Sequence, residues 1–212
     1  NFAATAYLNR WKVKIYYEHY FDDHSQMFFQ YGRWKDGHIG LEITFPKNRF
    51  IDTFVYEGLG TKDQTGPMLY DSFWGEFEEQ ISAKDNYYNH YLYQGWQHWG
   101  MGIGNPLLPG PIYNKNGQIT FISNRVLAHH IGFCGSPCQS LSYRMLLSYS
   151  RHWGTYDNPL NEIKKQFNSL FEVTYAPQQL KGWSFTVSGA MDRGNLLGNN
   201  YGGMLVIRKQ GI

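Results

Sequence analysis

The feature that most constrains this chain is the strict alternation of apolar and polar side chains over long runs. The run at residues 10–21 shows both sides of the pattern: Trp11, Val13, Ile15 and Tyr17 against Lys12, Lys14, Tyr16 and Glu18. Because successive side chains of a β-strand point to opposite sides, this pattern predicts a strand with one apolar and one polar face. Four later runs alternate in the same way, at residues 39–45, 141–150, 167–175 and 183–192. The sequence therefore predicts an all-β fold.

The links between these runs predict how the strands are ordered. Weaker strand candidates lie at residues 28–33, 50–57, 119–133 and 202–209, which brings the expected number to about nine strands. Asp36-Gly37 has the composition of a type I′ hairpin turn. Strands that follow one another through short connections usually pair as neighbours, which predicts an antiparallel meander. A short stretch at residues 161–167, after Pro159, is the one candidate for a turn of helix.

One long segment, residues 61–117, breaks the alternation. It is rich in aromatic residues, Gly and Pro, as in the strings NYYNHYLYQGWQHWG and MGIGNPLLPGPIYN. A connection of this length inside a compact meander usually has a function or its own local structure. We expect this insertion to leave the sheet and to form a compact, aromatic-rich feature.

Charge and hydropathy exclude several classes of protein. The 212 residues contain 19 Lys and Arg against 17 Asp and Glu, a formal net charge of +2, which is too even for a dedicated nucleic-acid-binding protein. No stretch approaches the run of about 18 apolar residues that a transmembrane helix needs. The mean hydropathy of −0.51 still permits a membrane-spanning β-barrel, because such a barrel has apolar side chains only at every second position.

The alternation fits two architectures, a transmembrane β-barrel and a soluble β-sandwich. The strong runs reach about 10 residues, the length of a tilted strand that crosses a bilayer. Aromatic residues gather near strand ends, as in the girdles at the two membrane interfaces, and the opposite sides carry polar residues that suit a wet lumen. These features favour the barrel. Residues 1–212 are then one β-barrel region, with residues 61–117 as a loop insertion.

The barrel interpretation assigns individual residues to its two sides. The residues predicted to face lipid are Val13, Ile15, Ile43, Leu147, Val173 and Val187. The residues predicted to face the lumen are Lys14, Glu42, Arg144, Glu172 and Thr186. An odd strand number further predicts that the first strand, at residues 11–21, does not pair with the last, at residues 202–209. The chain is then part of a larger barrel.

Several long strings in this chain resemble a known family. They are YYEHYFDDHS, GLEITFPKNRF, VYEGLGTKDQTGP, DNYYNH, GWQHWGMGIGNPLL and NRVLAHHIG, with NRWKVKIYYEH before them and LLGNNYGGMLVIRK at the end. Nearly the whole chain resembles the Bacteroidetes branch of the capsule assembly protein Wzi family. The resemblance implies the C-terminal half of an outer-membrane β-barrel. It also implies a lectin-like function that holds or organises capsular polysaccharide at the bacterial cell surface.

The insertion contains the residues best suited to bind a carbohydrate. The candidates are Trp96, Trp99, His98, Tyr87, Tyr88, Asp85 and Asn86. Flat aromatic rings stack on the apolar C–H faces of sugars, and nearby Asn and Asp side chains satisfy sugar hydroxyls. The same rings would also suit the packing of the loop onto itself or a position at a membrane interface. Both interpretations stay open for each residue.

No residue pattern indicates an enzyme or a bound cofactor. No nucleophile motif is present, and no set of His and Cys residues has the spacing of a zinc site. Cys134 and Cys138 are the two cysteines, and their spacing permits a small disulfide loop in an oxidising compartment.

The expected protein is therefore a non-enzymatic barrel of the bacterial outer membrane. Its partners are surface or capsular polysaccharide, outer-membrane lipid and other outer-membrane proteins, and nucleic acid is not among them. One alternative is an outer-membrane channel or a scaffold subunit of a larger membrane complex. Another is a soluble glycan-binding β-sandwich.

Overall fold

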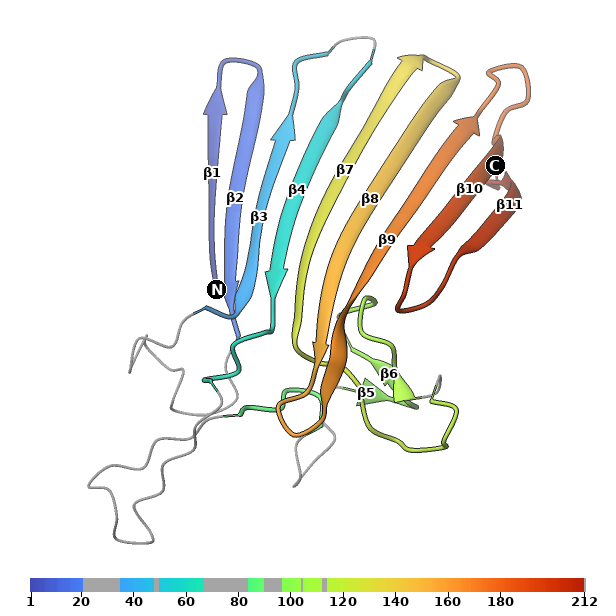
Figure 1. Cartoon of the computed structure of the whole chain (residues 1–212). Coiled ribbons are helices and arrows are strands. Elements are labelled where there is room, and N and C mark those ends of the chain that lie inside the picture. Colours follow the sequence, from blue (N-terminus) through green and yellow to red (C-terminus); the bar gives the residue numbers. More distant parts are fainter. Residues whose placement is uncertain are drawn as a thin grey trace, which may run out of the picture.

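An antiparallel sheet of nine strands dominates the computed structural model, which describes residues 1–20, 35–47, 50–66, 84–89, 97–103, 105–111 and 114–211 (Figure 1). The sheet comprises β1 (Phe2–Leu8), β2 (Trp11–His19), β3 (Gly37–Thr44), β4 (Thr53–Gly60), β7 (Val126–Cys138), β8 (Leu141–Gly154), β9 (Pro159–Tyr175), β10 (Trp183–Gly194) and β11 (Asn200–Lys209). A separate hairpin comprises β5 (Gln97–His98) and β6 (Met101–Gly102). The predicted all-β, antiparallel fold is confirmed.

The strands form a meander, as the short links predict. Their order in the sheet is the order in the chain, and each strand pairs antiparallel with its neighbour. One step is non-local, because β4 pairs with β7 across residues 61–125. The sheet is therefore built mainly from hairpins, with one long-range junction near its middle.

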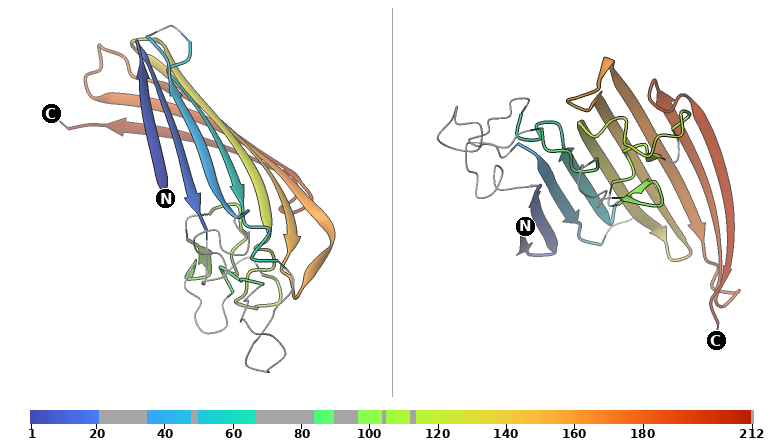
Figure 2. Two further views of the ribbon diagram at one scale, coloured as in Figure 1. Left: turned by 90° about the vertical axis from the view of Figure 1, so that its left-hand side faces the viewer. Right: turned by 90° about the horizontal axis from the view of Figure 1, so that it is seen from below.

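The sheet is an open trough whose two edge strands do not pair. Figure 2 shows its curvature, with β1 at one edge and β11 at the other. The prediction that the first and last strands do not pair is confirmed, but the strand predicted to be the first is not the edge strand. The strand that begins at Trp11 is β2, and β1 precedes it. The sequence Phe-Ala-Ala-Thr-Ala does not indicate β1, because its alanines give little difference in hydropathy between the two sides of the strand.

Cross-strand pairing sorts the side chains onto two faces. One row crosses the sheet through Val13, Ile43, Phe54, Phe133, Met145 and Phe171. A row of the opposite face passes through Tyr16, Gly40, Glu57, His130, Ser148, Asn168 and Asp192. We call these faces the apolar face and the polar face. The six residues predicted to face lipid lie on the apolar face, and the five predicted to face a lumen lie on the polar face.

The two ends of the sheet carry very different connections. At the upper end in Figure 1, Asn9 and Arg10 alone join β1 to β2, and Gln139 and Ser140 alone join β7 to β8. The long connections 20–36 and 61–125 leave from the lower ends of β2 and β4. Their described segments lie on the concave side of the trough (Figure 2). The polar face is this concave side, because its Ala128 belongs to a buried cluster with side chains of those segments.

Three local predictions are wrong, and each has a physical reason. The strand predicted at residues 119–133 begins only at Val126, because the preceding residues pack into the loops at the lower end. The stretch 161–167 is not helical but belongs to β9, which begins at Pro159, a position where a strand tolerates proline. Asp36-Gly37 is not a hairpin turn, because Gly37 is the first residue of β3 and pairs with both His19 and Gly60.

The strand predicted at residues 28–33 lies outside the described residues. No described segment forms a helix long and apolar enough to cross a membrane.

Candidate functional site

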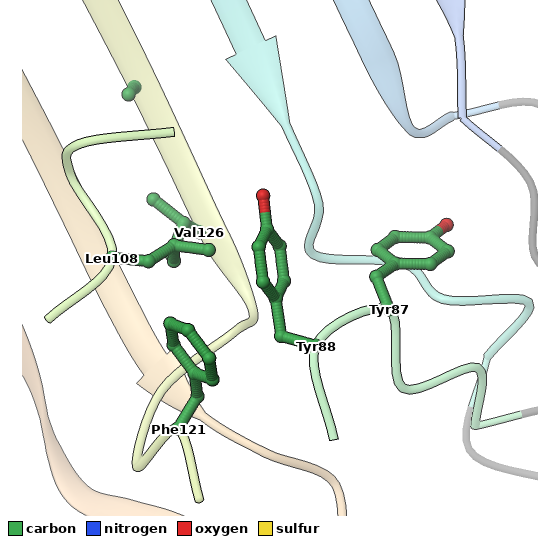
Figure 3. Close-up of a cluster of buried hydrophobic side chains, with 6 residues drawn as sticks. Tyr87, Tyr88, Leu108, Phe121 and Val126 are labelled. Atoms are coloured by element: carbon green, nitrogen blue, oxygen red, sulfur yellow. The ribbon is translucent and has the colours of Figure 1, made fainter. Parts of the chain in front are cut away.

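A small aromatic interior lies at the lower end of the sheet. It consists of Tyr87, Tyr88, Leu108, Phe121, Val126 and Ala128, drawn as sticks in Figure 3. The rings of Tyr88 and Phe121 lie with their centroids 4.9 Å apart. We call the described loop segments that surround this interior the cap: residues 61–66, 84–89, 97–103, 105–111 and 114–125. The cap thus has a core of its own beside the sheet.

The carboxylate of Asp36 organises one side of the cap. It accepts hydrogen bonds from the backbone amides of Asp63 at 2.8 Å and Gln64 at 2.7 Å, and from the Tyr87 hydroxyl at 2.8 Å. Burial raises the pKa of Asp36, and these hydrogen bonds lower it, with burial the larger effect. Sequence reasoning missed this role, because an Asp before a Gly has the composition of a solvated turn.

A second set of polar contacts joins distant segments of the cap. The Thr65 hydroxyl donates to the Asp85 carboxylate at 2.5 Å, and the Asn124 side-chain amide donates to the Asn86 side-chain oxygen. Asn89 forms a reciprocal pair with the backbone of Phe121, at 2.7 and 2.8 Å. Buried polar groups must be paired, and here each pairing ties two segments together.

Three of the predicted carbohydrate ligands belong to this interior. Tyr87, Tyr88 and Asp85 are 2 %, 4 % and 6 % exposed, so they present no ring or carboxylate to a ligand in this structure. Burial also raises the pKa of Tyr88. Asn86 is half-buried and holds Asn124. Trp96 lies outside the described residues.

Trp99 and His98 lie instead at the surface. Trp99 is 86 % exposed, and its ring lies edge-on to His98 with 6.1 Å between centroids. Trp99 and Gly100 form the two-residue turn between β5 and β6, with φ angles of 51° and 75°. Such a type I′ turn favours Asn or Gly, so a tryptophan in the left-handed region is strained. Strain of this kind is typical of residues that a function holds in place.

A hollow of about 600 Å³ lies beside the Trp99 turn. Its lining residues are Gln97, Trp99, Gly100, Pro111, Asn114, Gly117 and Ile119. The Asn114 side chain donates to the backbone oxygens of Gln118 and Thr120, at 2.7 Å each, which fixes the outer wall. The hollow therefore combines one exposed ring with amide side chains, the composition that suits a sugar.

A second hollow, of about 670 Å³, lies on the polar face of the sheet. Within it the Tyr16 side chain crosses Gly40 and donates a hydrogen bond to Glu57. His38 lies between two carboxylates, with Nε2 3.5 Å from Glu57 and Nδ1 3.9 Å from Glu18. The hollow is therefore lined by acidic and aromatic groups together with aliphatic side chains such as Val55, Leu59 and Leu146. Sequence reasoning identified this face but not the role of Gly40, whose missing side chain makes room for the Tyr16 ring.

Further cross-strand pairs continue along the polar face. Arg144 lies 3.3 Å from Glu172, which also accepts a hydrogen bond from Ser188 at 3.2 Å. Lys12 lies 3.6 Å from Glu42. At the lower edge, burial and the charges of Glu18 and Glu57 raise the pKa of Tyr20 to about 12. The polar face thus carries charged and polar side chains on several strands, and these side chains contact one another across neighbouring strands.

Cys134 and Cys138 are free thiols, so the possible disulfide is not formed in this structure. Both residues belong to β7. A strand rises about 3.3 Å per residue, whereas bridged cysteines have Cα atoms about 4.4–6.8 Å apart. Extended backbone therefore separates the two thiols despite the irregular pairing between Gly135 and Cys138.

Within the described residues, no three His, Cys, Asp or Glu side chains are grouped in a way that would hold a metal ion. The chain matches no protein-family model, no curated protein and no solved structure.

Proposed function

We propose that this chain is the wall of an outer-membrane β-barrel of the Wzi-like type, which binds or organises capsular or surface polysaccharide. The observation that carries the proposal is the uncovered apolar face. Val187 and Leu205, paired across β10 and β11, are 60 % and 66 % exposed. A continuous apolar surface of this extent is unfavourable in water and suits lipid.

The distribution of charge on that face supports the same interpretation. On the described strands, the Lys and Arg side chains of the apolar face are Arg151, Lys165 and Arg193 in the lower half and Lys209 at the upper end. Aromatic residues of the same face include Trp11, Tyr143 and Trp183 near the upper end, and a lower register row crosses the sheet through Tyr17, Tyr149 and Phe167. Bands of this kind mark the two interfaces of a membrane-spanning barrel.

The β-sandwich alternative lacks an element that it needs. In a sandwich a second sheet covers the apolar face. In the described part of the chain the second sheet is the β5–β6 hairpin of two residues per strand. The hairpin belongs to the cap, and the described segments of the cap lie on the concave, polar side (Figure 2). The barrel therefore explains the exposed apolar face better.

The asymmetry of the connections supports an orientation. Outer-membrane barrels have short turns on the periplasmic side and long loops outside the cell. The cap would then face the exterior, with the exposed Trp99 ring and the adjoining hollow in reach of polysaccharide. The Asn114 side-chain oxygen in the wall of the hollow offers an acceptor for a sugar hydroxyl, while its amide nitrogen donates to the loop backbone. The polar face also keeps a channel function as a second candidate, because the 670 Å³ hollow lies on it.

Two measurements test the proposal. Flotation with phosphatidylcholine vesicles, together with heat-modifiable migration, should show insertion; a protein that stays monodisperse without detergent contradicts the barrel. Binding of purified capsular polysaccharide to the inserted protein should weaken in Trp99→Ala and persist in Phe50→Ala, an exposed aromatic at the opposite end. Single-channel conductance with no polysaccharide binding would instead favour the channel.

A further inference from the structure

Five basic residues gather where the apolar face meets the cap. Arg151 and Lys165 are direct cross-strand partners on β8 and β9, and Arg193 lies on the next strand opposite Phe167. Lys62 and Arg125 continue the same face beyond β4 and β7, where the Arg125 side chain donates to the Lys62 backbone oxygen at 3.1 Å. We call Lys62, Arg125, Arg151, Lys165 and Arg193 the basic patch.

Aromatic rings hold part of the basic patch in place. The Lys62 ammonium lies 4.5 Å from the centre of the Trp153 ring, and the Arg151 guanidinium lies 5.4 Å from the same centre. The Arg125 guanidinium lies 3.8 Å from the centre of the Tyr156 ring. Cations stacked in this way keep their outer N–H groups directed away from the ring and available to an anion.

The described acidic residues near this end pair with other cations. Asp63 lies 3.8 Å from Lys35, Asp157 lies 3.6 Å from Lys84, and Glu162 lies 2.6 Å from Lys164. Asp36 is buried and accepts three hydrogen bonds inside the protein. Among the residues that the structure describes, the basic patch therefore has no carboxylate partner.

We infer that the basic patch binds the phosphate groups of membrane lipid at the lower edge of the apolar face. The inference rests on the proposed function, because it requires the apolar face to be in contact with lipid. Tyr149 and Leu147 lie on the same side of β8 as Arg151 and farther from the lower end of the strand. A lipid whose acyl chain lies against the apolar face would therefore have its headgroup at the basic patch. Arg side chains bind phosphate oxygens in bidentate fashion, and clustered basic residues select anionic headgroups.

The test compares two triple variants that remove the same charge. The patch variant neutralises the three strand residues of the five in the basic patch, through Arg151→Gln, Lys165→Gln and Arg193→Gln. The control variant neutralises cations of the polar face and of an exposed loop, through Lys14→Gln, Lys115→Gln and Arg208→Gln. Native mass spectrometry in zwitterionic detergent measures retention of phosphatidic acid and phosphatidylcholine with the same acyl chains. Flotation with phosphatidylcholine vesicles measures insertion separately.

The parent protein and the control variant should retain phosphatidic acid in preference to phosphatidylcholine. The patch variant should lose about a hundredfold in phosphatidic acid affinity, from about fivefold for each basic residue near an anionic surface. Equal retention of the two lipids by an inserted parent protein would overturn the inference alone. Failure of the parent protein to float would overturn the proposed function and the inference together. Binding of polygalacturonate through the patch, without lipid retention, would assign the patch to polysaccharide instead.

Discussion

The sheet and the cap are stabilised in opposite ways. The sheet exposes its apolar side chains, such as Val187 and Leu205, and is ordered by backbone pairing between neighbouring strands. The cap encloses its own apolar cluster and ties distant segments together through single buried side chains such as Asp36. A substitution on the apolar face of the sheet should therefore act mainly through the contact of that side chain with the surrounding medium. A substitution in the cap should act mainly through the loss of internal contacts.

Asp36→Ala should have the largest effect and should act on the cap. It leaves two buried donors and one part-buried donor without an acceptor, and each buried unsatisfied group costs about 1–3 kcal/mol. Limited proteolysis should then cleave residues 61–125 while the heat-modifiable sheet persists. Asp36→Asn is the control, because it keeps one acceptor and should be less sensitive to protease. Loss of the sheet together with the cap would contradict the separation of the two regions.

Val187→Arg should have the next largest effect and should act on the sheet. A charge on the lipid side near mid-membrane costs about 2–4 kcal/mol, whereas Arg at the neighbouring Thr186, on the polar face, should cost little beyond its hydrogen bond to Thr174. Urea titration of vesicle-folded protein measures both free energies of unfolding. Equal tolerance of the two substitutions would refute the assignment of the faces.

Gly40→Ala should have a moderate effect on the sheet. The added methyl group would overlap the Tyr16 ring, which must move and release Glu57. Overpacking of this kind costs about 1–3 kcal/mol. Gly202→Ala on the same face is the matched control, since nothing lies within 4 Å of its added carbon. Equal free energies of unfolding for the two variants would show that the Tyr16 crossing is not required.

Trp99→Gly should have the smallest effect on stability, and its sign should be favourable. Glycine relieves the left-handed strain, which is worth about 1 kcal/mol at a residue of this kind. The same variant should lose polysaccharide binding, because the exposed ring is gone. A thermal melt combined with a polysaccharide-binding assay checks both. Retained binding would remove Trp99 from the candidate site.

The same contrast explains what could be predicted from the sequence. Alternation identified most strands of the sheet and the faces of residues such as Val13 and Lys14, because a strand repeats every two residues. It missed β1, whose alanines give no contrast. The aromatic composition of residues 61–117 predicted a separate compact feature, but not its internal contacts. Asp36 and Thr65 bind partners far away in the chain, and no local period indicates such pairings. Tyr87 and Tyr88 were plausible as ligands for the same reason, because composition does not reveal burial.

The junction of β4 with β7 has a consequence for how the molecule folds. Every other pairing in the sheet joins strands that are consecutive in the chain, so β1–β4 and β7–β11 each form through smaller loop closures, of which residues 20–36 between β2 and β3 are the longest. Joining the two halves closes the loop of residues 61–125, and closure entropy rises with loop length. Low contact order within each half favours rapid formation of that half, whereas the pairing of β4 with β7 is expected to be the slow step. Formation of the cap, which shortens that loop, should therefore govern the rate at which the two halves become one sheet.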